Sequence, residues 1–233
     1  MRGIPRPSTS APLRTGASTP SQPLSSTPQV VRIGDLDIAI RTPPDFDALL
    51  DAAARQTPND VDTIPYYAAL WPSANALADV LWERRDTLLG RRVLELGCGL
   101  GLPSIVASRL GAEVMATDFH PDAGAWCEAN AAANHAALTF HVCDWNTPPA
   151  WRPFDVVIGS DLIYERRHIP SLAASIGKFC AADGVALIAD PGRDGLASLT
   201  AAMQADGWRC ELLPHGEIYV LAFTRGGAPA IRA

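Results

Sequence analysis

The chain has 233 residues, of which 48% are hydrophobic, and its formal net charge is -6. This length suits one α/β domain with a large core, and the negative charge argues against a nucleic-acid partner, which usually requires a basic surface. No apolar run reaches the roughly 18 residues of a membrane-spanning helix, so we expect no membrane partner. The five cysteines are widely spaced and show no metal-ligand spacing with the histidines, which predicts no metal site and a reducing compartment.

The chain begins with a low-complexity segment. Residues 1–28 are rich in Pro, Ser and Thr and contain no acidic residue, which predicts a disordered tail. Such a start also resembles an organellar transit peptide, so the expected cytoplasmic location has an organellar alternative. Residues 29–60 are expected to form an N-terminal extension, with a hairpin turning at Gly34 and a helix over 44–55. Residues 61–233 then form the main domain.

Strand-like and helix-like segments alternate through the main domain. The expected parallel strands lie at 93–96, 113–118, 138–143, 154–160 and 185–190, each opening one of five βα units. Two further strands, at 210–213 and 217–224, are joined by a loop too short for a parallel crossover, so they must form an antiparallel hairpin. The fold class predicted is α/β: a Rossmann-like, doubly wound, mostly parallel seven-stranded sheet with a C-terminal antiparallel hairpin.

The first of these strands runs into a glycine turn that reads Glu95-x-Gly97-x-Gly99-x-Gly101. Glycines at alternate positions let the backbone bend and approach a ligand without Cβ clashes. A dinucleotide fingerprint would need glycine where Leu102 stands, and the Gly-Lys-Ser/Thr of a phosphate-binding loop is absent. The turn therefore predicts a ligand at the carboxyl edge of the sheet and argues against phosphate.

This pattern resembles motif I of class I, seven-β-strand S-adenosylmethionine (SAM)-dependent methyltransferases, and the resemblance covers about residues 60–225. SAM carries no phosphate, and its ammonium and sulfonium charges suit acidic and aromatic neighbours. Asp118, at the end of the second strand, is placed to accept both ribose hydroxyls, although such residues also cap helices. The cofactor site implied by the resemblance comprises Trp71, Glu95, Gly97, Cys98, Gly99, Gly101, Asp118, Phe119, Asp144, Trp145 and Ser160.

A narrower resemblance lies outside the glycine turn. Ala69-Leu70-Trp71-Pro72-Ser73, Asp144-Trp145 and Ser160-Asp161-Leu162-Ile163-Tyr164 look like the branch that contains many protein-lysine methyltransferases, including the electron-transfer flavoprotein β-subunit enzyme. The string Asp190-Pro191-Gly192-Arg193 also looks like the flavoprotein-methylating enzymes. The resemblance implies N-methylation of a lysine side chain in a protein substrate.

Asp161 and Tyr164 are the predicted catalytic residues, next to the transferable methyl group. Their spacing matches the Asp-Pro-Pro-Tyr of enzymes that methylate nucleic-acid amines, but Leu162-Ile163 replaces the two prolines, which disfavours a base as acceptor. Asp161 is expected to orient an amine by hydrogen bonding, and Tyr164 to offer its π face to a cation. The alternative is that Asp161 caps a helix and Tyr164 packs in the core.

Other functions remain open on the sequence. A small-molecule amine or pyridine N-methyltransferase and a non-catalytic SAM-binding regulatory protein share the same motifs, whereas Leu102 disfavours a nicotinamide-dependent oxidoreductase. Tyr66 and Tyr67 either line an acceptor channel or cover the sheet edge. The histidines and Glu165-Arg166-Arg167 are interpreted as structural or solvated groups. The sequence makes no prediction of the oligomeric state.

Overall fold

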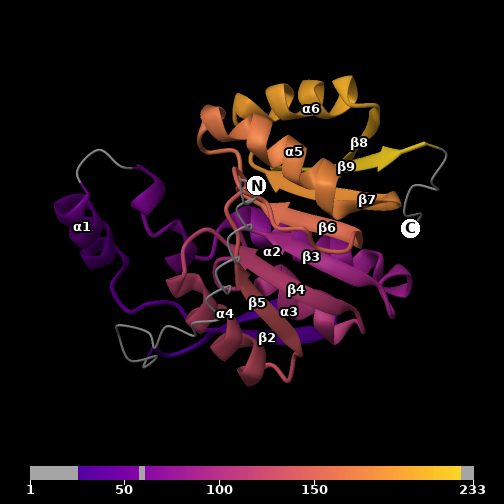
Figure 1. Ribbon diagram of the computed structural model, residues 1–233. Helices are drawn as coiled ribbons and strands as arrows, with labels where there is room; N and C mark the ends of the chain where they lie inside the picture. The colour runs from indigo at the N-terminus through magenta and orange to yellow at the C-terminus, as the bar shows by residue number, and fades with distance from the viewer. Residues whose placement is uncertain (1–25, 58–60, 227–233) are drawn as a thin grey trace, which may run out of the picture.

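The structure, a computed structural model, describes residues 26–57 and 61–226 (Figure 1). Residues 1–25 of the predicted tail lie outside the described part of the chain. The main element is a seven-stranded sheet of order β5-β4-β3-β6-β7-β9-β8. Its strands are β3 (Arg92–Leu96), β4 (Glu113–Asp118), β5 (Leu138–Val142), β6 (Phe154–Ser160), β7 (Cys180–Asp190), β8 (Trp208–His215) and β9 (Ile218–Arg225).

The pairing of these strands confirms the predicted fold class. β3 lies between β4 and β6, and all pairs from β5 to β7 are parallel. β9 then pairs antiparallel with both β7 and β8, so the chain ends in the expected hairpin. The carboxyl ends of β3, β4, β5 and β6 consequently meet at one edge of the sheet.

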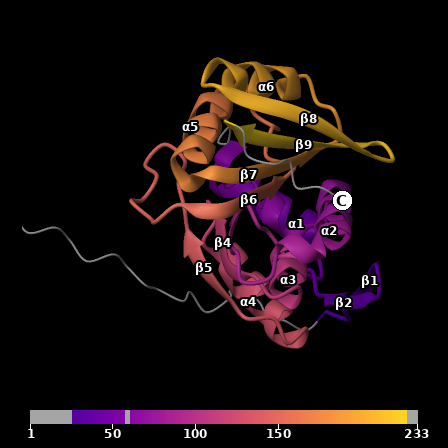
Figure 2. The ribbon, with the colours of Figure 1, turned by 90° about the vertical axis from the view of Figure 1, so that its right-hand side faces the viewer.

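Helices cover both faces of the sheet. One face carries α2 (Pro72–Glu83), α3 (Leu102–Arg109) and α4 (Asp122–Ala133), and the other carries α5 (Ile169–Phe179) and α6 (Gly195–Ala205) (Figure 2). Successive strand residues alternate between the two cores: Val93 packs with the first group of helices and Leu94 with the second. Within the described residues, no helix combines the length and apolarity needed to cross a membrane.

The expectation of five βα units is wrong at β5. After β5 the chain runs through residues 143–153 without a helix before it enters β6. Pro148, Pro149 and Pro153 in this segment lack the backbone N–H that a helix needs, which explains the irregular path. β7 also begins five residues before the predicted strand, and its pairing with β6 shifts register between Phe154 and Val156.

The N-terminal extension contains the two predicted elements. β1 (Gln29–Ile33) and β2 (Leu36–Ile40) form an antiparallel hairpin, and α1 (Phe46–Gln56) begins after its N-cap Asp45. Figure 1 shows α1 standing apart from the sheet. Short 3-10 helices lie at η1 (Val61–Thr63), η2 (Tyr66–Ala68), η3 (Arg85–Thr87) and η4 (Arg166–His168).

Two asparagines, Asn130 of α4 and Asn134 at its C-cap, hold the hairpin against the main domain. The Asn134 side chain accepts from the backbone N–H of Ala39 and donates to its carbonyl, both at 2.8 Å. Asn130, one helical turn earlier, exchanges the same pair of bonds with Arg41 at 2.9 and 3.1 Å. The backbone N–H and C=O groups of residues 39 and 41 point to the same side of the extended chain. The two side-chain amides therefore take the place of a neighbouring strand. Asn130 also donates to the carbonyl of Leu100, in the glycine turn, at 3.0 Å.

Replacing Asn130 should therefore affect both stability and the glycine turn. We expect Asn130→Ala to lower the free energy of unfolding by about 2–4 kcal/mol, because backbone groups of Arg41 and Leu100 lose their partners. It should also weaken binding of S-adenosylhomocysteine, the demethylated form of the cofactor that the sequence resemblance implies. Asn134→Ala, the matched control, should lower stability without weakening binding. Urea denaturation and titration calorimetry measure the two effects, and an equal loss of binding in both variants would contradict the link to the turn.

Candidate functional site

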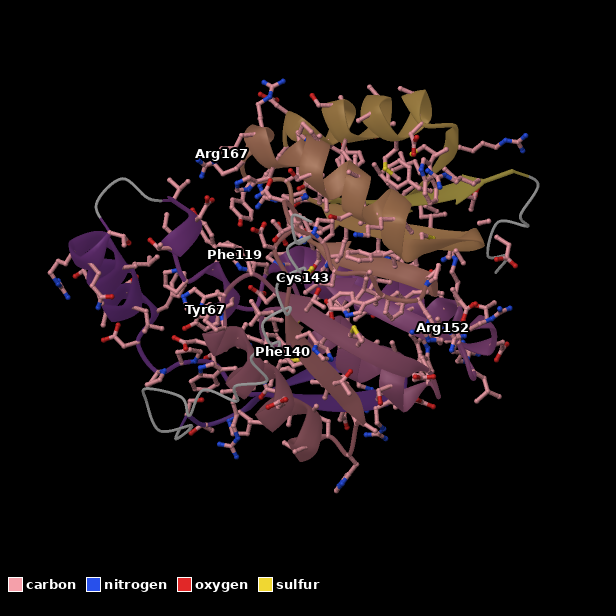
Figure 3. All side chains as sticks on the ribbon, viewed as in Figure 1. Tyr67, Phe119, Phe140, Cys143, Arg152 and Arg167 are labelled. Atoms are coloured by element: carbon pink, nitrogen blue, oxygen red, sulfur yellow. The ribbon has the colours of Figure 1, made fainter. Side chains whose placement is uncertain are left out.

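The described residues enclose a cavity of about 390 Å³ at the carboxyl ends of β3, β4, β5 and β6. Open parallel sheets bind their ligands at this edge. Figure 3 shows Tyr67 and Phe119 on this side of the sheet and Arg152 at the opposite side. The cavity brings together all of the predicted site residues except Glu95: Trp71, Gly97, Cys98, Gly99, Gly101, Asp118, Phe119, Asp144, Trp145, Ser160, Asp161 and Tyr164.

The packing of the protein itself requires glycines in this turn. Gly97, Gly99 and Gly101 have φ values of +63°, +49° and +86°, in the left-handed region that side chains disfavour. A Cβ added at Gly97 would lie 2.5 Å from Leu162 Cδ2, and one at Gly101 would lie 2.7 Å from Cys127 Sγ. The sequence suggested that glycine allows a ligand to approach closely. The structure adds a second reason, the close packing of Leu162 and Cys127 against the turn.

Glu95 does not line the cavity, which corrects its expected contact with the cofactor. The side chain is fully buried beneath the turn, where Oε2 accepts hydrogen bonds from the backbone N–H and the hydroxyl of Ser104. Ser104 lies in the first turn of α3, whose N-cap Gly101 has no side chain to cap it. The Glu95 carboxyl group therefore supports the helix that follows the turn. Burial raises the pKa of Glu95 to about 8, against the hydrogen bonds from Ser104.

Asp118 joins the glycine turn to the end of β4. Its Oδ2 accepts from the backbone N–H of Gly99 at 3.0 Å, and its Oδ1 accepts from that of His120 at 2.9 Å. Burial raises the pKa of Asp118, while these amide hydrogen bonds oppose the rise. Each carboxylate oxygen can accept a further bond, so Asp118 still has the acceptor capacity that ribose hydroxyls would need.

Asp144 and Trp145 follow β5 as predicted, and both are held by neighbours. Asp144 Oδ1 accepts from the backbone N–H and the side-chain amide of Asn146, at 2.8 and 3.0 Å. The carbonyl of Trp145 accepts from the Ser175 hydroxyl at 3.3 Å, and its ring lies 6.5 Å from that of His168. These contacts fix the wall of the cavity beyond β5.

The loop after β6, residues 161–164, places Asp161 and Tyr164 at the cavity. Leu162 and Ile163 are 3% and 2% exposed and pack in the core, so they anchor the loop where prolines stand in the related motif. Asp161 has φ +57°, an uncommon conformation for a residue other than glycine. Its Oδ2 is buried without a hydrogen-bond partner among the described residues. The alternative roles in helix capping and core packing do not fit these positions.

Aromatic rings form a continuous wall along the cavity. The ring of Tyr66 lies 6.2 Å from Trp71 and 5.0 Å from Tyr164, and His168 lies 6.2 Å from Tyr164 and 6.5 Å from Trp145. Trp71 Nε1 donates to the Tyr66 carbonyl at 2.9 Å, which fixes the start of this aromatic wall. Burial raises the pKa of Tyr164 to about 12, so its phenol stays neutral near pH 7. Tyr66 thus lines the cavity, one of the two roles that the sequence left open.

Some cavity residues were missed from the sequence. Arg193 reaches Asp161 from the loop after β7, and its only signal was the string 190–193, to which no role was assigned. Asp62, in η1, pairs with Arg167 at 2.8 Å and His168 at 3.2 Å across 105 residues or more. No local pattern predicts such a contact. Arg167, expected to be only solvated, lies on the same side of the sheet as Phe119 (Figure 3).

The charge of the cavity favours a cationic ligand. Four carboxylates line it, those of Asp62, Asp118, Asp144 and Asp161, and Arg193 is the only lysine or arginine that the described residues contribute. The ammonium and sulfonium of SAM fit this surplus of negative charge and the aromatic wall. The backbone of the turn, which carries no side chains at Gly97, Gly99 and Gly101, and the spare acceptor capacity of Asp118 suit the rest of the molecule. The described residues hold no group of three or more metal-ligating side chains.

The buried carboxyl of Glu95 predicts an unusual dependence of stability on pH. Between the pKa of about 4.3 in an unfolded chain and the folded value of about 8, the folded protein keeps a proton that the unfolded chain releases. Stability should therefore fall as pH rises through this window, by roughly 3–5 kcal/mol. Glu95→Gln should abolish this contribution and Glu113→Gln, at an exposed site, should not. Urea denaturation at pH 5 and pH 8 measures this change in the free energy of unfolding. An equal change in wild type and Glu95→Gln would contradict the assignment.

Comparisons with known proteins agree with this site. The histone-arginine methyltransferase METTL23 of Homo sapiens is 32% identical over 115 residues, which cover 46% of this chain and 60% of that protein. The electron transfer flavoprotein beta subunit lysine methyltransferase of Danio rerio is 33% identical over 131 residues, which cover 55% of this chain and 51% of that protein. The chain thus spans about half the length of the curated relatives it matches.

A solved structure and a family model complete the comparison. The 16S rRNA N2 G1207 methyltransferase RsmC of T. thermophilus, at 17% identity, superposes with a TM-score of 0.65 over 88% of this chain and 53% of that one, which shows the shared fold. The resemblance to class I methyltransferases is confirmed. A family model described as lysine methyltransferase matches residues 61–195, more than half of the sequence. The chain therefore belongs to the lysine methyltransferase family.

Proposed function

We propose that this protein is a SAM-dependent N-methyltransferase whose acceptor is a lysine side chain of a protein substrate. The observation that carries the proposal is the free Oδ2 of Asp161, buried at the cavity and beside the aromatic wall. A buried carboxylate oxygen without a partner is costly, so its presence favours a ligand that donates a hydrogen bond. An amine acceptor supplies that donor. Membership of the lysine methyltransferase family supports the same acceptor.

The residues of the cavity divide into two groups. The glycine turn, Asp118, Trp71 and Trp145 would hold the cofactor, which supplies an electrophilic methyl group on its sulfonium. Asp161 would receive an N–H of the acceptor and fix the direction of its lone pair. Tyr66 and Tyr164 would shield the amine from water and face its positive charge before the proton is lost.

The acceptor nitrogen must be neutral before it can attack. A free lysine has a pKa near 10.4, so most of it is charged near pH 7. Exclusion of water by the aromatic wall disfavours the ammonium, whereas the Asp161 carboxylate favours it. Asp161 therefore serves to orient the amine, and the pKa of Tyr164, raised to about 12, makes its phenolate a poor candidate for the base near pH 7.

Arginine is the second candidate acceptor. METTL23 proteins of several species, at 30–32% identity, are named histone-arginine methyltransferases. A guanidinium also donates hydrogen bonds to a carboxylate and stacks on aromatic rings, so Asp161 and the aromatic wall suit it as well. Amino-acid analysis of the product separates the two acceptors.

Labelling a proteome tests the proposal. The protein is incubated with radiolabelled SAM and extract from a strain that lacks it, and labelled bands are hydrolysed to identify the methylated residue. We expect N-methyl-lysine in protein bands. Asp118→Asn should reduce labelling, because weaker hydrogen bonding costs about 1–3 kcal/mol of cofactor affinity. Asp122→Asn, a nearby carboxylate that does not line the cavity, is the matched control. Label found only in small molecules, or only in methyl-arginine, would overturn the lysine acceptor.

A further inference from the structure

Arg193 holds together two carboxylates at the end of the sheet. Its Nη1 donates to Asp161 Oδ1 at 2.7 Å and to Asp190 Oδ2 at 2.8 Å. Asp190, the last residue of β7, is fully buried, and its Oδ1 accepts from the backbone N–H groups of Gly192 and Arg193 at 2.9 and 2.7 Å. Both oxygens of Asp190 are therefore used to fix Arg193, through its backbone and through its side chain.

Asp161 and Arg193 line the cavity, and Asp161 is the one of the two carboxylates that does so. Its backbone N–H donates to the carbonyl of Ala189 at 2.9 Å, which continues the pairing of β6 with β7 beyond Ser160. Its side chain is 10% exposed, with one oxygen on Arg193 and the other without a partner. The φ of +57° is disfavoured for a residue with a side chain, so the surrounding contacts must hold it. Among the residues that the structure describes, Arg193 is the one that pairs with this side chain, so the ion pair can hold it there.

We propose that Arg193 is a positioning residue for methyl transfer: it fixes the Asp161 carboxylate with Oδ2 directed at the acceptor amine. Its charge also offsets that carboxylate, so that the acceptor ammonium gives its proton to water before the neutral amine attacks. This inference rests on the proposed function. It concerns the acceptor and not the cofactor, because the glycine turn, Asp118 and Trp145, which would hold the cofactor, follow or end β3, β4 and β5, and Trp71 is the N-cap of α2.

Negative charges predominate around the place proposed for the acceptor amine. Asp161 and Asp190 carry two negative charges, and Arg193 reduces the sum to one. The other titratable groups that line the cavity are Asp62, Tyr66, Tyr67, Cys98, Asp118, His120, Cys143, Asp144, Tyr164 and His168. None of them is a permanent cation. Loss of Arg193 would therefore raise the pKa of a bound ammonium, and the rate would rise only at higher pH.

Variants of Arg193 separate this role from simple support of the loop. We expect Arg193→Gln to bind S-adenosylhomocysteine within about twofold of wild type, because the glycine turn is untouched. Its methylation rate should fall about 100-fold, the effect of a misplaced catalytic contact, and its rate–pH profile should move to higher pH. Arg193→Lys should recover part of the rate, since a single nitrogen makes both contacts and an ammonium can replace it.

Arg225→Gln is the matched control. Arg225 has a similar exposed fraction, 33% against 32% for Arg193, and pairs with Asp206 away from the cavity. Removing its charge should leave the rate and its pH profile as in wild type. A wild-type rate and pH profile in Arg193→Gln would overturn the proposal. So would a loss of S-adenosylhomocysteine binding in both Arg193 variants, because that result assigns Arg193 to the general support of the fold.

A structure of Arg193→Gln with S-adenosylhomocysteine decides the positioning claim without an acceptor. We expect the Asp161 side chain to leave its place at the cavity and its φ to become negative. An unmoved Asp161 would overturn the positioning role. A wild-type protein that methylates no protein lysine would sink the proposed function, and the Arg193→Gln structure would still show whether Arg193 positions Asp161.

Discussion

Leu162 joins the two halves of the site. Its side chain packs against the turn after β3 and against β6: a Cβ added at Gly97 would lie 2.5 Å from Leu162 Cδ2, and one at Gly159 would lie 2.5 Å from Cδ1. Core side chains are packed too tightly to admit an extra carbon there. The glycine turn and the loop of Asp161 and Tyr164 are therefore held at one fixed separation. Methyl transfer needs this rigidity, because donor and acceptor must meet in line.

The carboxyl groups around this contact differ in how much of their hydrogen-bonding capacity is already used. Glu95 lies below the turn, away from the cavity, with Oε2 on Ser104 and Oε1 without a partner among the described residues. Asp190 has both oxygens engaged by Arg193 and the loop after β7. Asp118 has both oxygens engaged by backbone amides but keeps acceptor capacity towards the cavity. Asp161 alone combines a fixed oxygen with a free one at the cavity. Chemically similar groups therefore serve three different purposes here: support of the fold, cofactor binding and acceptor recognition.

Much of this arrangement could be predicted from the sequence, because it depends on local pattern. Alternating apolar segments predict the parallel sheet, and residues after successive strands must meet at its carboxyl edge, which brought Asp118, Asp144 and Asp161 together in advance. The roles of Glu95 and Arg193 could not be predicted in this way. A carboxyl group near the end of a strand can face a ligand or the following helix, and its partner is set by contacts that form only in the folded chain.

Contacts between distant segments were the other limit. Asn130 and Asn134 read as ordinary polar residues of a helix, yet they complete the edge of the hairpin some 90 residues earlier. The prolines after β5 argue against a helix in that segment. The expectation of a helix there came from the regular alternation of strands and helices in the rest of the domain. In both cases the deciding interaction is specific to one place in the fold, whereas periodicity reports only the average environment of a segment.

The most direct measurement is a crystal structure of the protein with S-adenosylhomocysteine. We expect ribose hydroxyls within hydrogen-bond distance of Asp118, and a sulfur atom that faces the space between Asp161 and Tyr164. A ligand whose ribose lies away from Asp118, or whose sulfur is directed away from Asp161, would contradict it.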